Sequence, residues 1–178
     1  MGSNITSIIT TLVLVSNIIF VLGLALLFAE PKFKKWVYEF VDKNILKILF
    51  TLSLAAVVGS LTYSNIIGFA PCELCWVQRI FMYPQVILTF VAMLKKDKNI
   101  VNYLLPLSIL GIITAFYHSM GQWGFGNSLG GCLSVGAECG KVYVRGFNYI
   151  TIPFMSFTIF AYLIAVTLVY YKAQNARK

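Results

Sequence analysis

The sequence predicts an all-α integral membrane protein: a four-helix transmembrane bundle plus one additional N-terminal transmembrane helix, within a single membrane domain spanning residues 1–178. Hydrophobic residues make up 59% of the chain and charged residues only 11%, unlike the balance in soluble domains. A spanning helix needs about 20 apolar residues. Four stretches without a charged side chain reach that length, and they are residues 5–29, 48–70, 100–120 and 146–171.

The N-terminal stretch, residues 5–29, is expected to be an uncleaved spanning helix that is extra to the bundle. It lacks the basic start of a signal peptide, and its apolar part is too long for one. Residues 30–47 follow as a cytoplasmic basic loop. Because aromatic residues are mixed with lysines there, we expect a short interfacial helix within it.

Residues 48–171 are expected to form the four-helix core, with residues 121–148 as a loop between its last two helices. One core span, residues 80–94, is short and reaches spanning length only if it begins near Trp76. That start places Arg79 in the first turns, at the membrane interface.

A proline within this short span suggests a binding slot. Pro84 cannot donate a hydrogen bond to the carbonyl of Ile80, so the helix is expected to bend about one turn below Arg79. We hypothesise that the bend and the neighbouring rings form a slot for a planar lipophilic molecule. The rings are those of Trp76, Phe81 and Tyr83.

The positive charge indicates a membrane orientation and not a nucleic-acid partner. The net charge is +8, but the lysines and arginines gather after the first span, after the third span and at the C-terminus. By the positive-inside rule, those segments are cytoplasmic, whereas the N-terminus and both cysteine-containing gaps lie outside. The expected location is therefore the cell membrane, with both cysteine loops extracytoplasmic.

The first cysteine pair lies at the start of the third span. Pro71 can open a helix there, which places Cys72 and Cys75 on one face of its first turn, where their thiols can close a disulfide. A helix start stabilises a thiolate, so we expect a lowered cysteine pKa. Arg79 lies on the same face and needs a polar or anionic partner, for which a thiolate or a bound electron acceptor is suited.

The second pair, Cys132 and Cys139, lies in a glycine-rich gap outside the membrane. Six residues separate the two cysteines, a ring that closes easily in a loop. An exposed disulfide there is suited to attack by the thiolate of another protein, although a static bridge that staples the loop is the alternative.

Two further alternatives concern metal binding and a histidine. A Cys-x-x-Cys motif is also half of a zinc site, although zinc would prefer a second close pair or several histidines, and His118 is the only histidine. His118 lies near the outer end of the fourth span. It is a weak candidate for lining an acceptor site, since it can equally be a polar residue satisfied at the interface.

The run Pro71 to Pro84, PCELCWVQRIFMYP, resembles the signature of the disulfide bond formation protein B (DsbB) family, especially its Gram-positive BdbC-like branch. The run Ile150 to Ser156, ITIPFMS, is similar to the start of that family's last helix. The resemblance covers roughly residues 47–171. The first span is extra relative to the usual four-helix form.

The resemblance implies an enzyme that reoxidises an extracytoplasmic thioredoxin-fold thiol oxidase, of the DsbA or BdbD kind, and passes the electrons to membrane quinone. The quinone would be menaquinone or ubiquinone. Cys72 and Cys75 match the quinone-facing disulfide pair, and Arg79 matches the arginine beside the quinone. Cys132 and Cys139 match the loop disulfide that exchanges with the partner. The alternatives are a vitamin K epoxide reductase-like protein and a membrane scaffold or metal-binding protein with structural cysteines.

Overall fold

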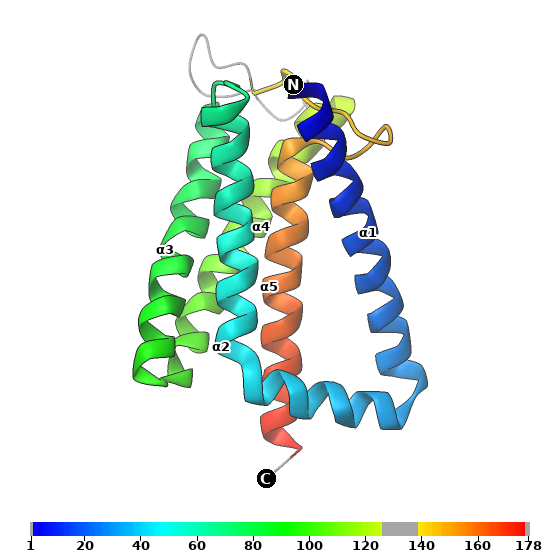
Figure 1. Ribbon diagram of the computed structural model, residues 1–178, viewed down its shortest axis with the longest axis vertical. Helices are drawn as coiled ribbons and strands as arrows, with labels where there is room; N and C mark the ends of the chain where they lie inside the picture. Colours follow the sequence, from blue (N-terminus) through cyan, green and yellow to red (C-terminus); the bar gives the residue numbers. More distant parts are fainter. Residues whose placement is uncertain (1, 126–138, 177–178) are drawn as a thin grey trace.

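The computed structural model describes residues 2–125 and 139–176, and within them it contains five helices long and apolar enough to span a membrane (Figure 1). These spanning segments are Asn4–Ala29, Pro31–Ile66, Glu73–Lys95, Lys98–Gly124 and Ile152–Asn175. No strand is formed by the described residues, apart from one isolated bridge between Gly146 and Ile150. The predicted fold class, a helical bundle with one added N-terminal helix, is confirmed.

The second helix, α2 (Pro31–Leu61), joins the basic segment to the bundle without a break. It follows α1 (Gly2–Ala29) after a single residue and begins at a proline, which suits the first turn of a helix because its missing N–H would have no partner there. In Figure 1 the first part of α2 crosses below the bundle before the helix turns upright. Residues 30–47, predicted as a basic loop with a short helix, are therefore largely helical.

The remaining helices complete the bundle. A π-helical turn, η1 (Thr62–Ile66), ends the second span and leads to α3 (Glu73–Lys95). The chain continues through η2 (Lys98–Ile100) and α4 (Val101–Met120) to a second π-helical turn, η3 (Gly121–Phe125). The last helix is α5 (Ile152–Asn175).

The core lies where α5 packs against α2 and α4. Ile45, Leu49, Leu104 and Phe160 are at most 2% exposed. Gly111 of α4 admits the Phe160 ring so closely that a Cβ atom there would lie 2.3 Å from it. The small residue thus sets the close approach of α4 and α5.

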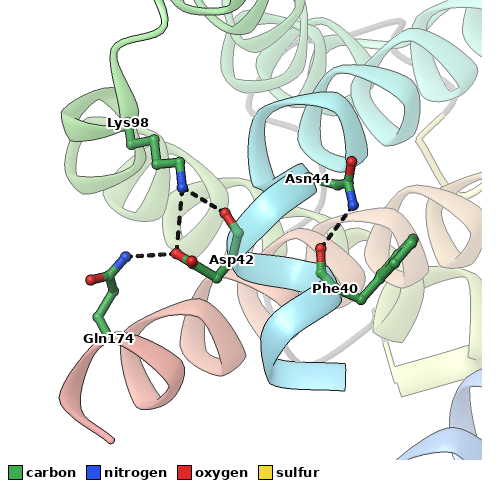
Figure 2. A network of polar contacts seen from close by, with 5 residues as sticks. All are labelled: Phe40, Asp42, Asn44, Lys98 and Gln174. Atoms are coloured by element: carbon green, nitrogen blue, oxygen red, sulfur yellow. Dashed lines mark hydrogen bonds and ion pairs between the residues drawn. The ribbon is translucent and has the colours of Figure 1, made fainter. Parts of the chain in front are cut away.

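A polar network holds the lower end of the bundle (Figure 2). Asp42 of α2 is buried, and its Oδ1 accepts hydrogen bonds from Lys98 Nζ at 3.4 Å and Gln174 Nε2 at 2.7 Å. Lys98 Nζ also donates to the Asp42 carbonyl at 2.6 Å. This network joins the turn of α2, the start of the fourth span and the end of α5.

The two ends of the bundle differ in what they carry. The N-terminus, the α2–α3 connection and the segment before α5 lie at one end, and the C-terminus lies at the other (Figure 1). The α1–α2 and α3–α4 connections share the C-terminal end. Lysines are therefore concentrated at one end, while the segments that contain Cys72, Cys75 and Cys139 lie at the opposite end.

Candidate functional site

The first cysteine pair sits at the start of α3. The helix begins at Glu73, two residues later than the predicted start at Pro71, so Cys72 is its N-cap and Cys75 lies in its first turn. Both side chains are partly buried free thiols, and their Sγ atoms lie 3.2 Å apart. One thiol can therefore donate a hydrogen bond to the other, and the pair is placed to close the predicted disulfide.

His118 contacts this pair from the end of α4. Its side chain is only 2% exposed, and its Nε2 lies 3.7 Å from Cys72 Sγ. The amide nitrogen of Gln78 contacts the other ring nitrogen, Nδ1, at 3.0 Å. Because an amide nitrogen can only donate, Nδ1 accepts, and the ring proton of a neutral imidazole then sits on Nε2, toward the sulfur.

These contacts make Cys72 the thiolate of the reduced pair. The pKa of Cys72 is lowered to about 4. The largest cause is a hydrogen bond from the Cys75 thiol, and His118 also lowers the pKa, whereas burial raises it. Backbone N–H groups at the helix start favour the same anion. The predicted thiolate at the start of this helix is therefore supported, at Cys72.

Arg79 lies one turn further along α3 and points toward the end of α2. Its Nε donates to Ser60 Oγ at 3.0 Å, and its Nη2 lies 3.4 Å from the Ser60 carbonyl oxygen. The guanidinium also lies over the rings of Trp76 and Tyr83, with its Cζ 5.1 and 6.0 Å from their centroids. The polar partner that the sequence required for Arg79 is thus, in this structure, Ser60.

A cavity of about 600 Å³ opens beside the cysteines. Cys72, Cys75, Arg79 and His118 all line it, so the structure brings these predicted site residues to one place. Its other walls come from α1, α2, α5 and the segment before α3. Most of these wall residues are apolar, including Val13, Leu52, Ala56, Met82, Ile152 and Ile159.

The aromatic wall of the cavity differs from the predicted one. Trp76, Phe81 and Tyr83 do not line this cavity, so the hypothesised slot around them stays a prediction. The rings that line it are Tyr63, Phe69 and Tyr143. They stack in series, with centroids 6.1 Å apart for the first two and 4.8 Å for the second two. Pro84 is tolerated within the continuous helix α3.

Several polar atoms in the cavity wall are suited to meet a ligand. Tyr63 Oη, Gln122 Oε1 and Ser156 Oγ are buried and have no hydrogen-bond partner among the residues that the structure describes. Buried polar groups without partners are uncommon and cost free energy. The Tyr63 and Ser156 hydroxyls can donate to carbonyl oxygens, whereas Gln122 Oε1 can only accept, for example from a hydroxyl group. Together with apolar walls and the Arg79 guanidinium, this set fits a planar, hydrophobic molecule whose oxygens alternate between carbonyl and hydroxyl, such as a quinone and its hydroquinone.

The second cysteine pair is described only in part. Cys139 is buried and disulfide-bonded, and its carbonyl oxygen lies 3.2 Å from Nε2 of His118. The same nitrogen therefore contacts both Cys72 and Cys139. Cys132 lies outside the described residues, so its pairing with Cys139 stays a prediction.

The structure provides only part of a zinc site for the metal-binding alternative. Cys72, Cys75 and His118 offer three donor atoms within 4.8 Å of one another, and they form the one such group found among the described residues. A closed structural zinc site takes four protein ligands. The group of Cys72, Cys75 and His118 provides three donors, one fewer than such a zinc site takes.

Sequence reasoning missed three residues of this site: Gln78, Ser60 and Tyr63. Gln78 stands between Cys75 and Arg79 in the motif, and a buried glutamine on a membrane helix was the available signal. Ser60 is near the end of α2 and Tyr63 is on η1, so both lie outside the motif in sequence. No local pattern indicates that they meet Arg79 and the cavity.

The geometry agrees with the comparisons with known proteins. The family described as disulfide bond formation protein DsbB matches residues 42–170. The chain belongs to the DsbB family. We found no significant match among solved structures.

Relatives named as disulfide formation proteins occur in Bacillus, Oceanobacillus and Deinococcus. The chain is 40% identical to the SPbeta prophage-derived disulfide bond formation protein B of Bacillus subtilis (strain 168), across 71% of this chain and 84% of the relative. It is 39% identical to the disulfide bond formation protein C of the same organism, across 64% and 82%. A probable disulfide formation protein of Oceanobacillus iheyensis is 34% identical, across 76% and 94%. This DsbB-family chain is thus a membrane disulfide bond formation protein.

Proposed function

We propose that this DsbB-family protein reoxidises an extracytoplasmic thioredoxin-fold thiol oxidase and transfers the electrons to a membrane quinone. The observation that carries the proposal is that Cys72, Cys75, Arg79 and His118 meet at one apolar cavity. The chemistry of the cavity wall supports a quinone there. A bound quinone would accept two electrons and two protons and leave as the hydroquinone.

Electrons would enter through the loop pair. A thiolate of the reduced partner attacks the Cys132–Cys139 disulfide and forms a mixed disulfide, which the second partner thiol then resolves. The partner leaves oxidised, and the two loop cysteines become thiols. The carbonyl contact between Cys139 and His118 supports this sequence, because it brings Cys139 close to the first pair.

The loop thiols then reduce the first pair. A loop thiolate attacks the Cys72–Cys75 disulfide, and completion of this exchange restores the loop disulfide and leaves Cys72 and Cys75 as thiols. The reduced pair is stabilised by the Cys72 thiolate and its contacts with Cys75 and His118. Stabilising the reduced form makes a disulfide more oxidising, which favours electron flow toward this pair.

Arg79 and His118 would assist the last step, the transfer of electrons from the reduced Cys72–Cys75 pair to quinone. Arg79 holds a positive charge at the cavity wall, where it would stabilise the negative charge that develops on a bound quinone. His118 holds a proton on Nε2 next to the sulfur. The Cys72–Cys75 disulfide re-forms as two electrons leave the pair, so the cycle can restart.

The sidedness proposed from the lysine distribution agrees with the fold. The segments that contain Cys72, Cys75 and Cys139 share an end with the N-terminus, and the basic α1–α2 and α3–α4 connections share the other end with the C-terminus (Figure 1). With the basic end in the cytoplasm, both pairs face the compartment in which disulfides persist. Family membership also favours this function over that of a vitamin K epoxide reductase-like protein.

The test is quinone reduction by the purified protein with a reduced thioredoxin-fold oxidase. Cys72→Ser should abolish turnover with the protein dithiol and also with a small dithiol. Cys139→Ser should abolish turnover with the protein dithiol only. Arg79→Ala should raise the quinone KM by about tenfold, the scale of one charge-assisted contact, while Arg79→Lys should recover part of the loss.

Three outcomes would overturn the proposal. The first is an absence of quinone reduction by the wild-type protein. The second is turnover that does not depend on Cys72. The third is cysteines that keep one redox state while the protein binds zinc in equal amount, which would favour the metal-binding alternative.

A further inference from the structure

The N-terminal helix lies outside the family match but takes part in the cavity. The match begins at residue 42, after α1 and the first part of α2. Nevertheless, α1 residues stand in the cavity wall with Cys72 and Arg79. These α1 residues are Ile9, Leu12, Val13 and Ser16.

The spacing of these residues defines a face of α1. Positions 9, 13 and 16 are separated by about one turn each, so they follow one side of the helix, and all three are half-buried. Val15, Ile19 and Leu22 are 47–64% exposed and are absent from the cavity wall. One side of α1 thus faces the cavity, and another is available to lipid.

Polar contacts hold α1 against α5. The hydroxyl of Tyr162 donates to Asn17 Oδ1 at 2.6 Å and lies 3.1 Å from Ser16 Oγ. The Phe20 ring packs on the Tyr162 ring, with centroids 4.4 Å apart. Such hydrogen bonds between membrane helices contribute about 1 kcal/mol each, which is enough to set the position of a peripheral helix.

A second attachment lies nearer the cysteines. Thr10 is 4% exposed and packs closely on Gly146. A Cβ atom added to Gly146 would lie 2.6 Å from Thr10 Cγ2. Gly146 belongs to the segment that leads from Cys139 into α5. The cavity-lining part of α1 is therefore attached both to α5 and to the segment before it.

We propose that α1 is the outer wall of the quinone site and sets its affinity for a quinone with an apolar tail. This inference rests on the function proposed above and adds a helix to its binding site. Without α1, the side of the cavity between α2 and α5 would open to lipid, and a bound ring or tail would lose its contacts there. Asn17 acts as a positioning residue, because it holds Tyr162 without lining the cavity.

The test compares the same valine-to-tryptophan substitution at two positions of α1 that face different sides of the helix. Val13 lines the cavity, whereas Val15 is 47% exposed and does not. Val13→Trp should fill part of the cavity and raise the Kd of a short-tailed quinone by at least about tenfold, and Val15→Trp should leave the Kd unchanged. Equilibrium binding to the purified, oxidised protein gives this Kd without turnover.

A second variant covers the case in which Val13→Trp fails to fold. Asn17→Leu leaves the cavity wall intact but removes the acceptor for Tyr162, so α1 should loosen and the Kd should rise by about threefold to tenfold. Val15→Trp should also leave unchanged the rate at which a reduced protein partner reduces the Cys132–Cys139 disulfide.

The outcomes separate this inference from the proposed function. Wild-type binding together with equal Kd values for Val13→Trp, Val15→Trp and Asn17→Leu would overturn the role of α1 and leave the proposed function standing. No quinone binding by the wild-type protein would overturn both. A tenfold difference between the two tryptophan variants supports α1 as the wall.

Discussion

At the scale of single residues, the chemistry depends on how Cys72 is surrounded. The sulfur lies at a helix start, 3.2 Å from the Cys75 thiol and 3.7 Å from the His118 ring. The Cys75 thiol and the His118 ring can each donate a hydrogen bond to this sulfur, and neither carries negative charge. The negative charge of the reduced pair therefore lies on the Cys72 sulfur, at the edge of the cavity.

The lowered pKa of Cys72 predicts an unusual pH dependence. Its pKa falls from 9.0 to about 4, so the thiolate persists as the pH falls and disappears only near the lower value. The alkylation rate of Cys72 in the reduced protein should stay nearly constant from about pH 8 to about pH 5, whereas an ordinary thiol slows about tenfold per pH unit over this range. Mass spectrometry of iodoacetamide-treated protein measures this rate.

Two buried glutamines of α3 provide a matched comparison. Gln78 donates to His118, whereas Gln85 lies two turns away and accepts from Ser108. Gln78→Met should move the alkylation midpoint of Cys72 upward, because His118 loses the contact that directs its proton toward the sulfur. Gln85→Met should leave the midpoint unchanged. A midpoint near 9 in the wild-type protein, or equal midpoints in both variants, would contradict this account.

The sequence predicted some of these residues and missed others for a physical reason. Cys72, Cys75 and Arg79 follow one another at helical spacing, so their shared face can be deduced from local periodicity. The approach of His118 depends on how α4 packs against α3, which no short motif records. The structure places His118 in the cavity wall and also in contact with Gln78, so its role toward an acceptor stays a prediction.

At the scale of the elements, the lower end of α2 is held by one buried carboxylate. Asp42 joins α2 to Lys98 and to Gln174 of α5, at the point where α2 turns into the bundle (Figure 2). Its neighbour Asn44 donates to the carbonyl of Phe40, one turn earlier in the helix. Position 42 therefore matters more for stability than the other acidic positions of this segment.

Asp42→Ala should lower the free energy of unfolding by about 1–3 kcal/mol, because the partly buried Gln174 amide and the Lys98 ammonium lose the carboxylate that accepts from both. Lys98 is 41% exposed, so its ion pair with Asp42 accounts for little of this loss. Thermal unfolding in detergent, followed by circular dichroism, measures the change.

Glu39→Ala serves as the control, since Glu39 is exposed on the same segment. Its unfolding temperature should match that of the wild-type protein. Equal unfolding temperatures for Asp42→Ala and the wild-type protein would contradict the structural role of this network.

At the scale of the whole molecule, hydrophobicity predicted the number of spans but not their packing. Five apolar segments separated by alternating basic gaps are sufficient to deduce five helices. The sequence did not show that α1 would line a cavity, because its apolar residues suit lipid and protein contacts equally. Nor did it show that the rings of Tyr63, Phe69 and Tyr143 would replace those of the motif in the cavity wall.

The arrangement of the ends has a functional consequence. Cys72, Cys75 and Cys139 belong to segments at the same end of the bundle, and one nitrogen of His118 contacts Cys72 and the Cys139 backbone. The proposed electron path from the loop to the cavity would therefore not cross the membrane. The account's central claim is that the two pairs act in series, with the quinone as the final acceptor.

Trapping of thiols with a mass tag in sealed membrane vesicles tests this claim most directly. With reduced partner and no quinone, both pairs should become labelled from the extracytoplasmic side, and added quinone should return both to disulfides. In Cys139→Ser, the partner should leave the Cys72–Cys75 pair oxidised. Labelling of either pair from the cytoplasmic side, or a Cys72–Cys75 pair that does not respond to quinone, would contradict the account.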